Sequence, residues 1–259
     1  MALSACTLFP VADDAPVERK VAALLPVDAL LLGEQHDAAA HHAIEREAVE
    51  ALATRGRLAA LALEMAEEGN DTTHLPASAS DAQVQTALRW NDKAWPWADY
   101  GPAVMAAVRA GVPVVGANLP RGRMKDAMAD VSLDAQLGDA AREAQRQAVR
   151  DGHCGLLPEA QIGPMTRIQI ARDRAMAQAV IKARQPGRTV LLVAGAGHVL
   201  RPLGVPQHLP SDFKVASVRL LAAATADDDD GARDYDATWR TPPLPAKDYC
   251  AGVKAPARP

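Results

Sequence analysis

The chain has 259 residues, of which 49% are hydrophobic but only 3% are aromatic. This length is enough for one large domain with a buried core, built mainly from alanine, leucine and valine. The formal net charge of −4 gives no electrostatic reason to expect binding to nucleic acid phosphates. No run of eighteen or more apolar residues marks a membrane-spanning helix.

The first residues match the pattern that lipoprotein signal peptidase reads. Leu3-Ser4-Ala5-Cys6 combines an aliphatic residue, two small residues and a cysteine, and a loose segment follows at residues 10–16. We therefore expect residues 1–27 to be a leader or tether, with a truncated lipoprotein signal and outer-membrane anchoring through a lipidated Cys6. The alternative is a chance occurrence of small residues beside a cysteine.

Apolar runs and helical patterns alternate along the chain. Short apolar runs bounded by turn residues predict strands at residues 29–32, 58–63, 112–115, 189–194 and 214–221. Helical spacing of apolar residues predicts helices at residues 38–54, 100–110, 133–150 and 165–183. This alternation predicts an α/β fold with a mostly parallel central sheet flanked by helices on both faces, in a single domain over residues 28–222.

The end of the chain is expected to be irregular. Residues 223–259 contain four consecutive aspartates at 227–230, read as a solvated surface turn, and then a segment rich in proline and charge. The chain holds two further cysteines, Cys154 and Cys250. We expect two free thiols, and a disulfide between them is the alternative if the protein is exported to an oxidising compartment.

Ionisable residues follow four of the predicted strands at the same end. Glu34 and His36 follow the first strand, Glu64 the second, Arg121 the third and His198 the fourth. Because the carboxyl ends of parallel strands meet at one edge of a sheet, we expect the glutamates and histidines to converge there. Each of them alone also has a structural interpretation, such as a helix cap or a buried acid paired with arginine.

Such a cluster has the chemistry of a metal site. His36, Glu64 and His198 are candidate ligands of a divalent ion, zinc or manganese. In a metal-dependent hydrolase, Glu34 or Glu64 would act as the general base on a metal-bound water, with His36 and His198 as ligands or as donors to the transition state.

Other polar and aromatic residues suggest a ligand. Two glycines bracket His153 and Cys154, so that a turn presents the imidazole. Met176 shares a helix face with Arg172 and is read either as a ligand contact or as core filling. The aromatic cluster is read as a lid over a flat ligand or as a loop anchor, and it consists of Trp90, Trp95, Trp97 and Tyr100.

These motifs together resemble the ChaN-like haem-binding uptake family, within the wider grouping that holds the Tiki-type proteases and erythromycin-esterase-like proteins. The resemblance covers about residues 28 to 210. It rests on Gly33 to Asp37, His41-His42, Leu63-Glu64-Met65, Trp90 to Tyr100, Ala117 to Arg121, Gly152 to Gly155, Leu157-Pro158-Glu159, Gln169 with Arg172-Asp173, Met176-Ala177, Gly195 to His198, and Gly204-Val205-Pro206.

The resemblance implies a periplasmic or outer-membrane lipoprotein that binds haem for haem or iron acquisition, with haem held between two protomers of a homodimer. The candidate iron ligands are Tyr100, as a phenolate, and His153. Arg121 and Arg172 are the candidate partners of the haem propionates. The alternative function is the metal-dependent hydrolase described above.

Overall fold

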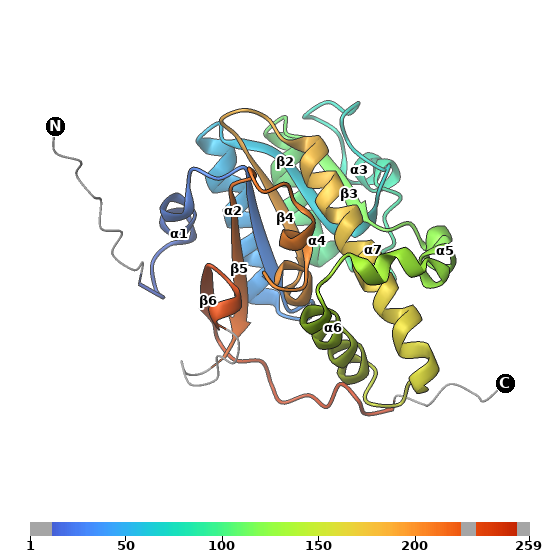
Figure 1. The fold of residues 1–259 in the computed structure, drawn as a ribbon. Helices are drawn as coiled ribbons and strands as arrows, with labels where there is room; N and C mark the ends of the chain where they lie inside the picture. The colour runs from blue at the N-terminus through green and yellow to red at the C-terminus, as the bar shows by residue number, and fades with distance from the viewer. Residues whose placement is uncertain (1–11, 224–231, 253–259) are drawn as a thin grey trace, which may run out of the picture.

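The computed structural model describes residues 12–223 and 232–252 (Figure 1). In this part of the chain, six strands form one sheet in the order β3-β2-β4-β1-β5-β6, and every pairing is parallel. The strands are β1 (Ala29–Glu34), β2 (Leu58–Glu67), β3 (Val114–Asn118), β4 (Thr189–Gly195), β5 (Val215–Ala222) and β6 (Ala237–Thr241).

Helices cover both faces of the sheet, as predicted. The α-helices are α1 (Val17–Leu24), α2 (Ala39–Thr54), α3 (Asp81–Ala87), α4 (Trp97–Arg109), α5 (Met124–Ala129), α6 (Asp139–Gly152) and α7 (Glu159–Ala183). The short 3-10 helices are η1 (Arg121–Arg123), η2 (Val131–Ala135), η3 (Ala196–Val199), η4 (Val205–His208) and η6 (Ala232–Asp234). Figure 1 shows α7 on one face of the sheet and α2 on the other.

The alternation of side chains along each strand builds two cores. In β1, Leu30 and Leu32 pack against α1, α2 and α4, while Leu31 packs on the opposite face with Met176 and Val180 of α7. Successive side chains of a strand point to opposite faces, so a strand with both faces covered is apolar throughout. The sheet therefore lies between two apolar layers, and its strand ends are where polar groups can be held.

Both ends of the chain contain structure that the sequence did not predict. The expected leader contains α1, which buries Val21 against the sheet layer, and the expected irregular tail contains β6, which buries Trp239. These two elements meet, since Lys20 of α1 lies 5.9 Å from the Trp239 ring. Strand β6 was missed because it has only five residues and lies at the sheet edge, where it buries one large side chain. Cys6 and the four aspartates at 227–230 lie outside the described residues.

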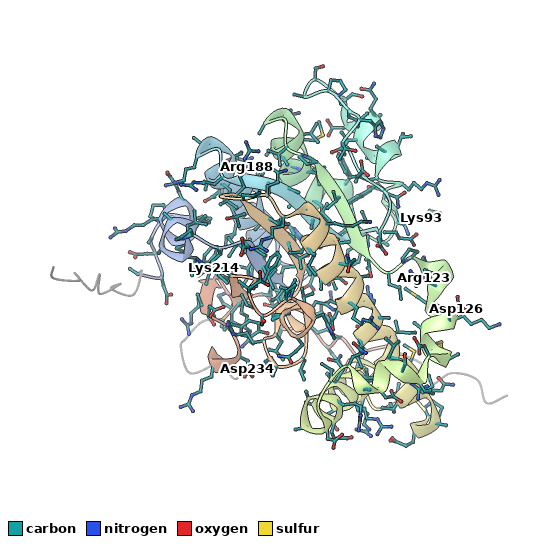
Figure 2. The ribbon with its side chains drawn as sticks, turned by 45° about the horizontal axis from the view of Figure 1, so that its top comes forward. Lys93, Arg123, Asp126, Arg188, Lys214 and Asp234 are labelled. Atoms are coloured by element: carbon teal, nitrogen blue, oxygen red, sulfur yellow. A yellow bond between two sulfur atoms is a disulfide. The ribbon has the colours of Figure 1, made fainter. Side chains whose placement is uncertain are left out.

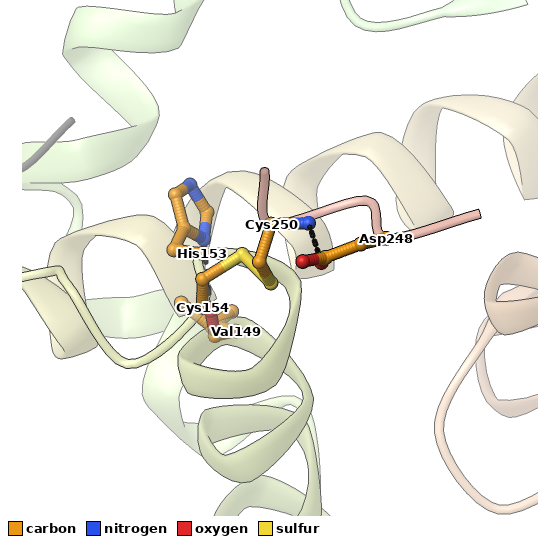
Figure 3. The surroundings of a disulfide bond; sticks show 5 residues. All are labelled: Val149, His153, Cys154, Asp248 and Cys250. Atoms are coloured by element: carbon orange, nitrogen blue, oxygen red, sulfur yellow. Dashed lines mark hydrogen bonds between the residues drawn. A yellow bond between two sulfur atoms is a disulfide. The ribbon is translucent and has the colours of Figure 1, made fainter. Parts of the chain in front are cut away.

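The two cysteines form a disulfide, so the expectation of free thiols is wrong. Cys154 and Cys250 are joined across a sequence separation of 96 residues, with their Cα atoms 5.7 Å apart (Figure 3). The bond joins the C-terminal segment, residues 242–252, to the turn between α6 and α7. The same segment is held beside the end of β1, because Lys247 and Tyr249 both contact the Asp37 carboxylate, at 2.8 and 2.9 Å.

Among the described helices, none has both the length and the apolar character needed to cross a membrane.

Candidate functional site

Strand register brings the predicted residues to one place. In the ladder between β1 and β4, Glu34 lies opposite Gly195, and in the ladder between β2 and β4, Leu63 lies opposite Val193. Glu34 is thus the last residue of β1, and Glu64 lies within β2 at nearly the same level of the sheet. As a result, the side chains of the four predicted residues gather within direct contact of one another or of a shared partner; they are Glu34, His36, Glu64 and His198.

One half of this cluster is built around Glu34, whose side chain is fully buried. Its Oε1 accepts a hydrogen bond from the Tyr100 hydroxyl at 2.9 Å and lies 2.8 Å from Nδ1 of His36. Burial alone would raise the pKa of Glu34, but the hydrogen bond and charge of His36 outweigh burial and lower the pKa to about 2. Glu34 is therefore a carboxylate at neutral pH.

The other half is built around Glu64. Its carboxylate accepts hydrogen bonds from Arg172 at 3.0 Å and from the Gly195 backbone N–H at 2.8 Å. His198 lies between two acids, with Nε2 at 3.5 Å from Glu64 and Nδ1 at 2.6 Å from Asp173. Burial would lower the pKa of His198, yet the two acids raise it to about 10. The charge of His198 and that of Arg172 in turn hold the pKa of Glu64 below its usual range despite burial.

His36 connects the two halves and is their accessible member. Its Nδ1 contacts Glu34, its Nε2 lies 3.9 Å from Glu64, and its side chain is 40% exposed. The ring packs edge-on against Trp95, with 4.8 Å between centroids. A Cβ on Gly195 would lie 2.9 Å from Nε2 of His36, so only glycine at this position leaves room for the imidazole.

The pKa of His36 follows from these surroundings. Burial acts to lower it, but the hydrogen bond to Glu34 and the charges of Glu64 and Glu34 raise it above the ordinary value. The two carboxylates therefore favour the protonated form of His36 more than water does.

The same contacts weaken the predicted metal set. Both nitrogens of His198 face carboxylates, with Nε2 at 3.5 Å from Glu64 and Nδ1 at 2.6 Å from Asp173. Both oxygens of Glu64 already accept hydrogen bonds. Within the described residues, the ligand atoms that come close enough to share one ion belong to a different set, Glu34, His42 and Glu45. The metal set of His36, Glu64 and His198 stays a prediction.

Tyr100 is buried beside Glu34. It is 2% exposed, its hydroxyl donates to Glu34, and burial together with the charge of Glu34 raises its pKa. The phenolate needed for ferric iron is therefore disfavoured in this conformation. The helix pattern placed Tyr100 at the start of α4 but could not show that its ring points inward.

Met176 and His153 are also separated from the cluster. Met176 is fully buried in the apolar core between α7 and the sheet, so it fills the core and has no exposed sulfur to offer a ligand. Nδ1 of His153 lies 2.8 Å from the Val149 carbonyl, in the turn that carries the disulfide (Figure 3).

The two predicted arginines have different surroundings. Arg172 belongs to the cluster, because it bridges Glu64 and the Asn118 side chain. Arg121 is exposed at the end of β3, where its backbone N–H donates to the Glu67 carboxylate.

The tryptophans anchor the loop before α4. Nε1 of Trp90 donates to the Trp95 carbonyl at 2.8 Å, and Nε1 of Trp97 donates to Asp81 at 2.9 Å. These internal bonds fit the loop-anchor interpretation. Trp95 alone also contacts the cluster, through His36.

Three members of the site were not among the predicted site residues: His42, Glu45 and Asp173. His42 and Glu45 lie three residues apart on α2 and face Glu34 together, while Asp173 follows Arg172 and orients His198. The helical spacing of His42 and Glu45 was a usable signal, since residues three apart share a helix face.

A parallel α/β sheet with a histidine- and carboxylate-rich cluster at its strand ends defines the class of ligand-binding α/β proteins. Within that class, the chain belongs to the family described as haem-binding uptake, Tiki superfamily, ChaN, whose model matches residues 21–209. The expected family resemblance is thereby confirmed.

Solved structures share the fold at low identity. The structure of ChaN of Campylobacter jejuni, reported for cofacial haem binding, is 23% identical, with a TM-score of 0.69 over 83% of this chain and 89% of that chain. The type III effector HopBA1 is 16% identical, with a TM-score of 0.51 over 89% of this chain and 95% of that chain. The comparison with curated proteins gave no match.

Proposed function

We propose that this protein binds haem and serves in haem or iron uptake. The observation that carries the proposal is family membership over residues 21–209. The haem-binding structure of the ChaN protein from Campylobacter jejuni, which has the same fold, is consistent with it.

A groove beside α7 offers a place for the ligand. It has a volume of about 780 Å³ and lies between α5, η2, α7 and η4. Its walls include apolar side chains such as Leu119 and Leu133. The charged residues that line it are two arginines and three acids, namely Arg123, Arg174, Glu68, Asp126 and Asp130. Figure 2 shows Arg123 and Asp126 at the side of the molecule that α5 forms. Haem requires this combination of apolar walls and cations for its propionates.

His208 of η4 supplies a candidate iron ligand at the same groove. Its Nε2 makes no hydrogen bond but is buried, so the ring would have to turn towards the groove to reach iron. Burial and the positive charge of Arg174 lower the pKa of His208 to about 4. The imidazole is therefore neutral at pH 7, which is the form that binds iron.

A haem titration followed by absorbance tests this proposal. We expect the wild-type protein to acquire a Soret band at micromolar haem, the variant His208→Ala to lose or shift it, and Arg174→Ala to bind more weakly. Tyr100→Phe and His153→Ala are the comparison variants, and we expect both to retain the wild-type spectrum. Absence of any spectral change in the folded wild type would refute haem binding. Loss of the Soret band in folded Tyr100→Phe or His153→Ala would assign the iron ligand to that residue instead of His208.

The cellular setting is also a proposal. We infer export to the periplasm, with anchoring at the outer membrane through lipidated Cys6, because the disulfide between Cys154 and Cys250 requires an oxidising compartment to persist. Mass spectrometry of the N-terminal peptide from membrane fractions would detect the lipid, and an unmodified Cys6 would contradict the anchor. We further propose a homodimer with haem between protomers, which sedimentation with and without haem would test.

A further inference from the structure

Three buried side chains converge between the end of β1 and α2, away from the proposed haem groove. We propose that Glu34, His42 and Glu45 form a binding site for one divalent transition-metal ion. Each residue offers one ligand atom, and these atoms all lie within 4.8 Å of one another. The three residues are only 2%, 7% and 1% exposed, respectively.

The ligand atoms lack other partners. Oε2 of Glu34, Nε2 of His42 and Oε1 of Glu45 are buried, and none makes a hydrogen bond. A buried polar atom without a partner costs about 1–3 kcal/mol. Because these three atoms lie close together, one partner could satisfy all of them, and a metal ion is such a partner.

The geometry fits a small ion with mixed nitrogen and oxygen ligands. Nε2 of His42 lies 3.2 Å from Oε2 of Glu34. In a tetrahedral zinc site, metal–ligand distances of about 2.0–2.2 Å place neighbouring ligand atoms roughly 3.3–3.6 Å apart. His42 and Glu45 are three residues apart on α2, so both project from the same helix face.

Neighbouring groups orient the ligands. Oε1 of Glu34 is engaged by the Tyr100 hydroxyl at 2.9 Å and by Nδ1 of His36 at 2.8 Å, which leaves Oε2 for the site. The His42 ring packs against Tyr100 at 4.7 Å between centroids. Metal sites in proteins are supported by outer hydrogen bonds of this kind.

The competing occupant is a proton shared between Glu34 and Glu45. Burial and the negative charge of Glu34 raise the pKa of Glu45, so a protonated Glu45 would relieve the repulsion between the two acids. That arrangement leaves Nε2 of His42 with a single contact, to Oε2 of Glu34 at 3.2 Å, whereas an ion would be ligated by all three side chains.

Zinc binding by the full chain tests the proposal. After dialysis against a chelator, the wild-type protein is titrated with Zn²⁺ alone, and a second sample is refolded from urea in Zn²⁺ so that slow entry does not hide the site. We expect one zinc per chain by elemental analysis after removal of loose metal, and a displaced Nε2 resonance of His42 in NMR. Glu45→Gln should weaken binding at least 100-fold.

Matched variants separate the outcomes. Glu47→Gln makes the same change at an exposed position of α2 and should bind zinc like wild type. Circular dichroism checks folding, and His42→Gln is the second test if Glu45→Gln does not fold. Zinc retained by folded Glu45→Gln, or no zinc in the refolded wild type, would overturn the proposal. The absence of zinc would also indicate that Glu34 and Glu45 share a proton instead of an ion. Neither outcome depends on haem binding.

Discussion

Replacing the Glu64 carboxylate with an amide tests the electrostatic account of the site. In the Glu64→Gln variant, the charges of Arg172 and His198 lose the acid that lies 3.0 and 3.5 Å from them. Breaking a buried ion pair by removing one partner costs about 3–5 kcal/mol. Arg172 keeps its bond to Asn118 and His198 keeps Asp173, so we expect a loss near the lower end, about 3 kcal/mol of unfolding free energy.

Urea denaturation at pH 7, followed by circular dichroism, measures this loss. The matched control is Glu50→Gln, which removes a half-exposed ion pair with Arg46 and should cost less than about 1 kcal/mol. NMR titration should also show the pKa of His198 falling from about 10 towards its ordinary value of 6.5. Because that pKa is raised by folding, the stabilisation is complete below pH 6.5 and disappears as the pH rises through about 10. A stability change no larger than the control's, or an unchanged His198 pKa, would refute this reasoning.

Two further predictions concern a glycine and the disulfide. In Gly195→Ala, the new methyl group would lie 2.9 Å from Nε2 of His36, so we expect the imidazole ring to leave the cluster. An NMR titration should then show the pKa of His36 falling towards its ordinary value. An unchanged His36 pKa would contradict the close approach. In Cys250→Ser, the disulfide no longer closes a loop of 96 residues, so the free energy of unfolding should fall by up to about 4–5 kcal/mol. Limited proteolysis of this variant should cleave the C-terminal segment first. Equal stability and equal protease resistance of oxidised wild type and Cys250→Ser would contradict that role.

Much of the fold and the convergence of the site could be predicted from the sequence. The five predicted strands overlap β1 to β5, because strands with both faces buried are continuous apolar runs with sharp ends. Glu34, Glu64 and His198 could be placed at one edge because parallel strands end together. These predictions need only the apolar runs that mark the strands and the parallel direction of neighbouring strands.

The remaining features depend on tertiary packing. The spacing of His42 and Glu45 indicates a shared helix face. That this face and the Tyr100 ring both point to Glu34 depends on how α2 and α4 are rotated against β1, which local periodicity leaves open. The disulfide joins positions 96 residues apart, and no local pattern reports such a distance. Gly138 interrupts the predicted helix at residues 133–150, so that η2 ends before α6 begins.

The disulfide helps to hold the C-terminal segment against Asp37, the residue that follows His36. This segment is fastened covalently at Cys154 and by ionic and hydroxyl contacts at Asp37. All of its own anchoring residues lie beyond residue 209, where the family match ends. A chain shortened to the matching residues would lose these anchoring contacts together with β5 and β6. A thiol reductant would break the disulfide and leave the contacts at Asp37. Ligand measurements on shortened or reduced protein would therefore be made with the C-terminal segment missing or released from Cys154.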